Sequence, residues 1–277
     1  MSDYDNFKLD KGYFNDFFIH DLSKQAYKLK LPLPPHRKTV NDIILLTDGE
    51  MTRSSGLDTF IVRKNSLFAL PAGLITTTSE ISIDIKGFYI HFSDSYLQSN
   101  NSKFAEYIQT PILKADKNEV DRLTYLLKQI VRIYNDNFNF DLIKSYLNTF
   151  LTEINHLSEH TKKSKNSNAE SIVISFKKLL SNYCTKEHSV GFYANKLNIT
   201  SNHLNKVTKS VLNKSSSSII NEMLILEAKV LIHQDNQNIG ELAYSLGFED
   251  PSYFGRFFKK HTGHTPTEFA KMIDLSE

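Results

Sequence analysis

The sequence predicts an α+β fold in two parts: an N-terminal antiparallel β-barrel with a helical region, and a C-terminal all-α domain. Short β-type runs broken by turn residues fill residues 1–113, which also hold most of the seven prolines. Residues 116–160 change to a helical periodicity. From residue 172 onward, each segment has the pattern of a short amphipathic helix.

The composition is that of a folded protein with two domains. The 277 residues are 40% apolar and 23% charged, and the net charge is only +2, so bulk charge indicates no partner. No apolar run approaches the ~20 residues that a membrane span needs, and the first residues lack the pattern of a signal peptide. A single cysteine, Cys184, cannot form an internal disulfide. These observations favour a cytoplasmic protein with no membrane partner.

The barrel is predicted from four runs of β-type sequence. The last run alternates Ile81, Ile83 and Ile85 with polar residues, which is the period of a strand. Turn residues such as Gly49 and Asn65 separate the runs. The four predicted strand regions are "DIILLTDGE" (42–50), "DTFIVRK" (58–64), "SLFALPAG" (66–73) and "EISIDIKGFYIHFS" (80–93).

Two amphipathic helices are predicted over residues 116–160. The first stripe contains Val120, Leu123, Leu127, Ile130 and Tyr134, and the second contains Leu142, Tyr146, Phe150, Ile154 and Leu157. The stripes must be buried, but a stripe alone does not identify its partner. One interpretation is packing on the barrel. The other is a homodimer in which Leu142, Tyr146, Phe150 and Ile154 form the contact.

The polar stretch "TKKSKNSNAES" (161–171) is predicted to be a linker between residues 1–160 and residues 172–277. Beyond it, capping and stop signals such as Asn198, Asn213, Gly247 and Gly263 divide the chain into helices. The predicted helices are about 174–186, 190–197, 201–212, 217–233, 239–246, 251–261 and 266–273.

This helical part contains an internal repeat. Ala194 and Leu197 match Ala243 and Leu246 at an offset of 49 residues. After a one-residue difference that falls in the turn, Leu204, Lys206, Val207, Lys209 and Asn213 match Phe254, Arg256, Phe257, Lys259 and Gly263. Each unit is a helix, a short turn at Asn or Gly and a second helix, which is a helix-turn-helix.

The second helix of each unit has one apolar face and one polar, basic face. Asn202, Asn205, Lys206 and Lys209 are on the outer face of the first, and Ser252, Tyr253, Arg256, Lys259 and Lys260 on that of the second. Arginine and lysine suit guanine edges, asparagine suits adenine, and lysines at helix ends suit phosphates. A solvated helix also needs a polar face, so one such helix would prove little. Two of them in register in a duplicated helix-turn-helix favour DNA binding.

The motif "NIGELAYSLGFEDPSYFGRFFKKHTGHTPTEF" resembles the DNA-binding domain of the AraC/XylS family of bacterial transcription regulators. "NEMLILEAKVLI" resembles the long connecting helix of that family. The resemblance is strong over residues 172–273. It is less specific over residues 1–160, which resemble a cupin-like sensor domain with a helical dimerisation region.

The resemblance implies roles for individual residues. The base-reading positions are Asn202, Asn205 and Lys206 in the first helix, and Ser252, Tyr253 and Arg256 in the second. Phosphate contacts are expected at Thr200, Lys209, Lys259 and Lys260. The connecting helix departs from the family in having Leu224 where an arginine is usual and Val230 where a basic residue is frequent.

The N-terminal part lacks the ligand set of a cupin enzyme. His36 is a weak candidate for contact with a small ligand, and His91 stands alone in the sequence. We therefore expect no metal, no cofactor and no catalytic residues. Cys184 is expected to pack rather than react.

The sequence thus predicts a one-component transcription regulator, activator or repressor, that binds double-stranded DNA and responds to a small-molecule effector. RNA polymerase is a possible further partner. Two alternatives stay open: a constitutive or partner-controlled regulator without an effector, and a cupin-type enzyme fused to a DNA-binding domain.

Overall fold

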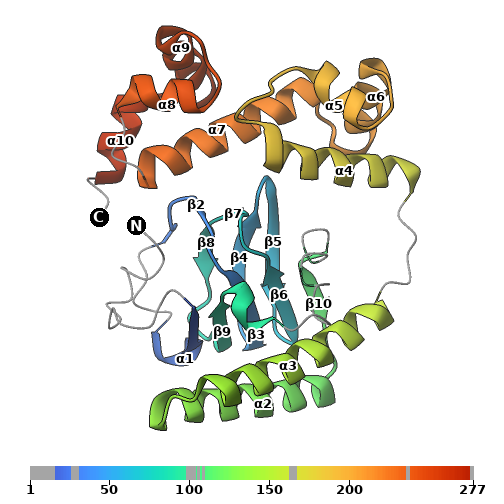
Figure 1. The fold of residues 1–277 in the computed structure, drawn as a ribbon, viewed down its shortest axis with the longest axis vertical. Helices are drawn as coiled ribbons and strands as arrows, with labels where there is room; N and C mark the ends of the chain where they lie inside the picture. The colour runs from blue at the N-terminus through green and yellow to red at the C-terminus, as the bar shows by residue number, and fades with distance from the viewer. Residues whose placement is uncertain are drawn as a thin grey trace. The chain divides into compact units, whose positions relative to one another are not determined.

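The computed structural model describes residues 16–25, 31–97, 104, 107, 110–161, 167–234 and 238–274. It divides the chain into two compact units, one of Met1–Leu33 and Arg37–Lys163 and one of Pro34–His36 and Ser164–Glu277. Figure 1 shows strands together with the helices α1, α2 and α3 in the first unit, and only helices in the second from residue 168 onward. The α+β class is therefore confirmed. The predicted barrel segment 1–15 and linker segment 162–166 lie outside the described residues.

The described strands form two main sheets and one two-stranded sheet. The five-stranded sheet has the order β1-β9-β3-β6-β10, the three-stranded sheet β5-β4-β8, and the small sheet β2-β7. The pairings β1–β9, β3–β9, β3–β6, β6–β10, β4–β5 and β4–β8 are antiparallel. The strands are β1 (Phe17–Asp21), β2 (His36–Arg37), β3 (Asn41–Asp48), β4 (Glu50–Ser55), β5 (Asp58–Arg63), β6 (Ser66–Leu70), β7 (Ile75–Thr76), β8 (Thr78–Ile81), β9 (Lys86–Phe92) and β10 (Ile112–Lys114), with a short helix α1 (Leu22–Gln25) and a 3-10 turn at Asp94–Tyr96.

Strand β3 lies at the centre of this unit and is buried on both faces. Ile43 and Leu45 belong to the core that includes α2 and α3, whereas Ile44 and Leu46 belong to the core shared with β4 and β5. Successive side chains of a strand point to opposite faces. The uninterrupted apolar run of β3 is therefore the consequence of having a core on each side.

The predicted strand over residues 80–93 is wrong in its first half. Strand β8 ends at Ile81 and β9 begins at Lys86, and a turn separates them. Ile83 at the tip of this turn is fully exposed, at 101% of its reference area. The alternating isoleucines therefore span a turn between two strands and do not form one continuous strand. Strand β4, whose sequence "EMTRSS" is polar, was not predicted.

Helices α2 (Lys117–Asp136) and α3 (Phe140–Thr161) lie side by side along the five-stranded sheet (Figure 1). A capping box between Asp116 and Glu119 begins α2. The predicted stripe of α2 is buried at Val120, Leu123, Leu127 and Ile130, and Tyr134 is half-buried and packs against the same core.

The predicted self-association stripe of α3 is wrong at two of its four positions. Phe150 and Ile154 are completely buried within one chain, in the same core as Ile43 and Leu45. A side chain with no exposed area cannot contact a second molecule. Leu142 is 46% exposed, because the buried face of α3 passes through Ile143 and Leu147 instead. Tyr146 is half-buried beside that core.

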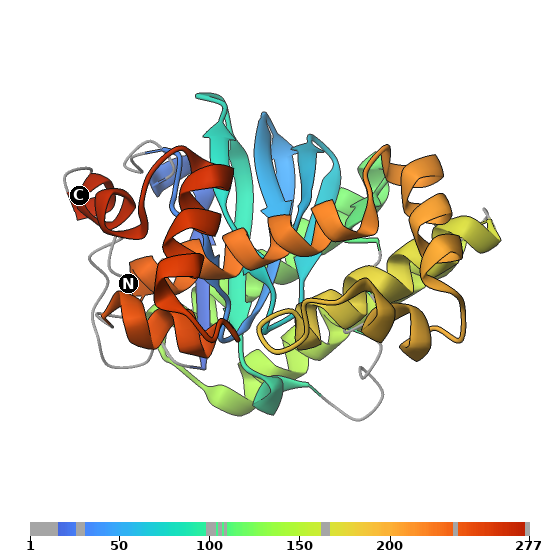
Figure 2. The same ribbon diagram turned by 90° about the horizontal axis from the view of Figure 1, so that it is seen from above.

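The second unit consists of helices connected by short turns. In Figure 2 helix α7 runs between the group α4–α6 and the group α8–α10. No helix among the described residues is long and apolar enough to cross a membrane. The helices are α4 (Asn168–Tyr183), α5 (Val190–Lys196), α6 (Ser201–Leu212), α7 (Ser216–Gln234), α8 (Ile239–Ser245), α9 (Pro251–Thr262) and α10 (Pro266–Asp274).

The predicted linker 161–171 is too long at both ends. Thr161 is still part of α3, and α4 begins at Asn168. Ser167 and Glu170 form a capping box at this start: the Ser167 hydroxyl accepts from the Glu170 amide and the Glu170 carboxylate accepts from the Ser167 amide. The stretch is polar except for Ala169, which favours a linker, but Ser followed three residues later by Glu is a helix-start signal.

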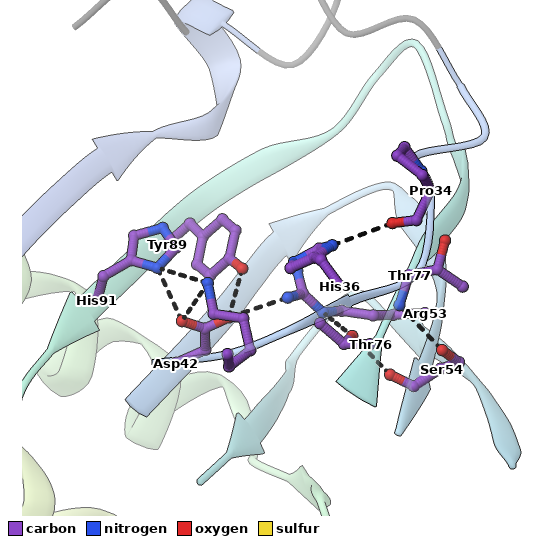
Figure 3. A network of polar contacts seen from close by, with 10 residues as sticks. Pro34, His36, Asp42, Arg53, Ser54, Thr76, Thr77, Tyr89 and His91 are labelled. Atoms are coloured by element: carbon purple, nitrogen blue, oxygen red, sulfur yellow. Dashed lines mark hydrogen bonds and ion pairs between the residues drawn. The ribbon is translucent and has the colours of Figure 1, made fainter. Parts of the chain in front are cut away.

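A fully buried carboxylate connects several strands of the first unit (Figure 3). Asp42 at the start of β3 accepts a hydrogen bond from the Tyr89 hydroxyl of β9 at 2.5 Å, and Arg53 of β4 donates to it at 2.9 Å. The Lys38 ammonium is 3.2 Å and the His91 Nδ1 atom 2.7 Å from the other oxygen. Arg53 also donates from Nε to Thr76 of β7 at 3.1 Å. One residue thereby connects three strands directly and a fourth through Arg53.

Burial alone would raise the pKa of Asp42, because it disfavours the charged form. The opposing attraction from Lys38, His91 and Arg53 is larger, so the pKa of Asp42 is held well below its ordinary value. The carboxylate is therefore ionised throughout the neutral range. The cluster of Lys38, Asp42, Arg53, Tyr89 and His91 is called the Asp42 cluster below.

The first prediction distinguishes core from surface on α3. Phe150→Ala leaves a cavity in a fully buried site, and we expect it to cost about 3–5 kcal/mol of unfolding free energy. Leu142→Ala, on the exposed side of the same helix, is the matched control and is expected to change stability by less than about 0.5 kcal/mol. Urea unfolding followed by circular dichroism measures both. Equal effects of the two substitutions would contradict the burial that the structure gives.

The second prediction concerns Asp42. Asp42→Asn leaves two buried cations with less counter-charge, and removing one partner of a buried ion pair typically costs about 3–5 kcal/mol. The folded pKa of Asp42 lies below that of an unfolded aspartate, about 3.9. Its charge therefore stabilises the fold above that pH, and this stabilisation is lost as the pH falls toward the folded pKa.

Urea unfolding at a series of pH values from neutral to 3 tests this sign. The unfolding free energy of the wild type should fall more steeply below about pH 4 than that of Asp42→Asn. Asp48→Asn at the other end of β3 is the control, because the Asp48 side chain is 38% exposed and its ion pairs with the exposed Lys64 and Lys86 are screened by solvent. Parallel pH profiles of wild type and Asp42→Asn would contradict the prediction.

Candidate nucleic-acid interface

The two helix-turn-helix units have the same turn. In the first unit the Asn198 amide donates to the Asn195 carbonyl and the Ile199 amide to the Ala194 carbonyl, each at 3.0 Å. In the second, the Gly247 and Phe248 amides donate to the Tyr244 and Ala243 carbonyls, also at 3.0 Å. Asn198 and Gly247 both have a left-handed backbone, with φ of 55° and 77°. The predicted repeat is confirmed down to its hydrogen bonds.

The structure also locates the one-residue difference between the units. In the first unit Thr200 follows Ile199 directly and caps α6, accepting from the His203 amide at 3.1 Å. In the second, Glu249 is inserted before Asp250, which caps α9 by accepting from the Ser252 amide at 2.8 Å. The extra residue lies in the exposed turn and leaves the two helix pairs unchanged.

Helix α6 presents a polar face to solvent. Leu204, Val207 and Thr208 are buried against the rest of the unit. The predicted base-reading residues Asn202 and Lys206 are exposed, and so is Lys209 one turn further along. The helix ends at Asn213, whose φ of 56° is left-handed.

Helix α9 has the same arrangement with aromatic anchors. Phe254 and Phe258 have no exposed area, and Phe257 is half-buried with its ring 5.3 Å from that of Phe248. The outward side chains are Ser252, Tyr253, Arg256, Lys259 and Lys260, all of them exposed. Tyr253 keeps 55% of its area accessible although it is aromatic. An exposed aromatic side chain among cations is suited to contact with a base or sugar.

The cations of this surface are available to a ligand. Lys206, Lys209, Lys259 and Lys260 form no ion pair with any other described residue. Arg256 is 3.8 Å from Asp250, but both side chains are more than half exposed, so this pair is weak and solvent-screened. The structure thus holds basic groups on the outward faces of both second helices without neutralising them.

Asn205 has a role that the sequence did not predict. Its side-chain oxygen accepts a hydrogen bond from the Ser216 amide at 2.9 Å, and Thr208 and Ser216 contact each other beside it at 3.1 Å. Asn205 therefore fixes the first turn of α7 to α6. A bidentate contact with adenine requires that same oxygen. Asn205 is accordingly less suited to base reading than Asn202.

The two positions of the connecting helix α7 that depart from the family pattern, Leu224 and Val230, are buried. Leu224 and Val230 are each 2% exposed. A buried apolar side chain at these positions presents nothing to a ligand. Cys184 and Glu227 are also buried in this unit, and the Cys184 thiol lies 3.7 Å from the Glu227 carboxylate.

The weak ligand candidate of the first part, His36, lies in β2 and is 4% exposed. Its Nδ1 atom donates to the Pro34 carbonyl at 3.1 Å (Figure 3). The Asp42 cluster is not predictable from the sequence, in which His91 stands alone; in the structure His91 contacts Asp42. The available signal was weak: charged residues such as Asp42 and Arg53 at the inward positions of strands. Among the described residues, no three His, Cys, Asp or Glu side chains gather as a metal site would require.

Comparison with known proteins identifies the second unit. Residues 193–272 match the model of the helix-turn-helix domain family. Over 252 residues the chain is 21% identical to the uncharacterized HTH-type transcriptional regulator YisR of Bacillus subtilis, which covers 85% of this chain and 87% of that protein.

Two further matches are shorter or weaker. The chain is 31% identical over 75 residues to the bifunctional transcriptional activator/DNA repair enzyme AdaA of Bacillus subtilis, covering 27% of this chain and 36% of that protein. Among solved structures, ToxT from Vibrio cholerae O395 covers 93% of this chain and 96% of its own, with 16% identity and a TM-score of 0.43. The matched family model and the duplicated turns together show that residues 193–272 are a helix-turn-helix domain built from two similar units.

Proposed function

We propose that α6 and α9 enter two consecutive segments of the major groove of double-stranded DNA and read its sequence. The observation that carries this proposal is the pair of outward faces, each polar and basic, on the second helices of two units whose turns share the same backbone hydrogen bonds. A helix fits the major groove, and consecutive segments on one face of the duplex are one helical turn apart. Selection of bound duplexes from a random library is the direct test.

The proposal assigns base contacts and phosphate contacts separately. Asn202 and Lys206 of α6, and Ser252, Tyr253 and Arg256 of α9, lie on the first two turns of their helices and contact bases. Thr200, Lys209, Lys259 and Lys260 lie at the helix ends and contact phosphates, fixing the register. Thr200 combines a hydroxyl with a helix N-terminus, which favours an anion.

The first unit is proposed to be a sensor that responds to a small-molecule effector. Its strands enclose a core, and the buried polar groups of the Asp42 cluster converge inside it. Polar groups that converge in an apolar enclosure are typical of ligand sites. The alternative is a constitutive or partner-controlled regulator. Screening small molecules for a rise in the melting temperature of the chain distinguishes them.

Several further features belong to the same proposal. The chain acts without catalysis, in agreement with the name of YisR as a transcriptional regulator, and in the cytoplasm where bacterial DNA is accessible. Homodimers would bind paired sites, although Phe150 and Ile154 cannot contribute to the contact. RNA polymerase is the partner that an activator would need. Sedimentation and reconstituted transcription test these two associations.

The third prediction concerns Arg256. Its exposed guanidinium near the centre of the outer face of α9 is expected to contact a guanine edge. On the duplex selected by the wild type, Arg256→Ala should cost about 1–3 kcal/mol and relax the preference at one base pair. Lys271→Ala on α10 removes one exposed charge outside both recognition helices and should leave that preference intact. If Arg256→Ala weakens binding to all sequences equally, Arg256 contacts phosphate instead.

The fourth prediction concerns salt. Each phosphate contact contributes about −0.9 to the slope of log affinity against log salt concentration. Changing Lys209, Lys259 and Lys260 together to alanine should therefore flatten the slope by about 3. A matched triple change of Lys178, Lys186 and Lys271, exposed elsewhere on the unit, alters the net charge equally. Equal slopes for the two triple variants would show that net charge alone is responsible.

A further inference from the structure

The loop between α4 and α5 contacts the turn of the second helix-turn-helix unit. The Nε2 atom of His188 in this loop is 2.9 Å from the Leu246 carbonyl, at the C-terminal end of α8. A carbonyl oxygen only accepts, so Nε2 carries the proton and donates. This hydrogen bond joins residues 58 positions apart in the sequence and lies between the two helix-turn-helix units.

The backbone at the contact approaches so closely that a side chain has no room. A Cβ atom added to Gly247 would be 2.7 Å from the Thr185 carbonyl oxygen and 3.3 Å from His188 Nε2. The φ of Gly247 is +77°, a value that also favours glycine. The turn that sets the angle between α8 and α9 therefore rests directly on the loop that precedes α5.

On the side of the second helix-turn-helix unit, contacts between aromatic rings extend from His188 to the recognition helix α9. The His188 ring is 5.0 Å from that of Phe248, and Phe248 is 5.2 Å from Phe254 and 5.3 Å from Phe257. Phe254 is completely buried and anchors α9. A displacement of His188 is thus transmitted to α9 through packed aromatic rings.

On the side of the first helix-turn-helix unit, the same loop is fixed to α5. The Tyr193 hydroxyl donates to the Glu187 carbonyl at 2.7 Å, and the buried Tyr193 ring is 5.4 Å from Phe176 of α4. Burial raises the pKa of the Tyr193 phenol, so the hydroxyl keeps the proton that it donates. Glu187 precedes His188 directly. The backbone next to His188 is therefore held by α5, the helix that packs against α6.

We propose that His188 is a positioning residue that fixes the spacing and orientation of the two recognition helices, so that they read two DNA segments at one separation only. This inference rests on the proposed function. Helix α7 is one connection between the two helix-turn-helix units. The hydrogen bond of His188 to Leu246 is a second connection, away from the axis of α7, and it resists rotation of one unit about that axis. Adding one base pair between two DNA segments moves them apart by about 3.4 Å and turns one relative to the other by about 35°. Rigid units do not tolerate this change, whereas loosely joined units do.

The experiment uses the full chain and the duplex that the wild type selects from a random library. A second duplex carries one additional base pair between the two segments. His188→Leu keeps an apolar contact with Phe248 but has no donor, and His188→Gln places an amide donor near the original Nε2 position. Ser181→Ala is the control, because it removes a side-chain hydrogen bond to the Lys177 carbonyl within α4 alone.

We expect the insertion to weaken wild-type binding by ~10-fold or more, within the range that a mismatched base pair costs. In His188→Leu we expect about five-fold weaker binding to the selected duplex, the effect of one net hydrogen bond. The same variant should discriminate between the two spacings by only about two-fold. His188→Gln should restore discrimination, and Ser181→Ala should retain it.

The inference is overturned if His188→Leu weakens both duplexes equally, because the ratio between spacings then does not depend on the contact. It is also overturned if His188→Leu binds both duplexes as the wild type does. If His188→Leu does not fold, His188→Asn, which is too short to reach Leu246, takes its place in the same series. If the wild type enriches no sequence, the proposed function itself fails, and this inference fails with it.

Discussion

The DNA-binding unit depends on one backbone constraint, the left-handed residue in each turn. Asn198 and Gly247 reverse the chain within three residues, so that the amide of the following residue reaches back to the first helix. Asparagine and glycine accept this conformation at little cost, whereas other residues are strained in it. The angle between the two helices of each unit follows from this turn. The outward faces of α6 and α9 are therefore set before any ligand is bound.

The N-terminal unit is organised around a different constraint, the charge of Asp42. Its carboxylate is shared between strands β3, β4 and β9, and neutral partners alone would not compensate for its burial. Such a network fixes the strands more specifically than apolar packing does, because each donor accepts only a narrow geometry. An anionic or strongly polar molecule entering this region would compete for the same donors. A ligand that acted there, as proposed, would therefore act on the same side chains that stabilise the fold.

Periodic and local features were predictable from the sequence, and features that join distant residues were not. The helices and turns of the second unit follow from caps, stops and a repeat that lie within a few residues of one another. The Asp42 cluster combines residues from four separate segments, and no local pattern encodes it. Ile83 satisfied the period of a strand yet lies on an exposed turn. Phe150 belongs to an apolar stripe on α3, and only the fold shows that this stripe packs into the core of its own chain. The hydrogen bond of Asn205 to α7 was likewise not predictable. The helical pattern shows which side chains point outward, but it does not show whether such a side chain already has a hydrogen-bond partner.

Pre-organisation determines how an effector can influence DNA binding in such a molecule. Two recognition helices held at one separation bind a matching pair of segments without a further loss of conformational freedom. An effector changes this binding only to the extent that it binds one arrangement of the chain more tightly than another. The rigid cores behind α6 and α9 offer few alternative arrangements, since Phe254 and Leu204 are completely buried. If an effector acts on this chain as proposed, contacts between the two helix-turn-helix units, such as the hydrogen bond of His188 to Leu246, are where it can change the arrangement with the smallest loss of packing.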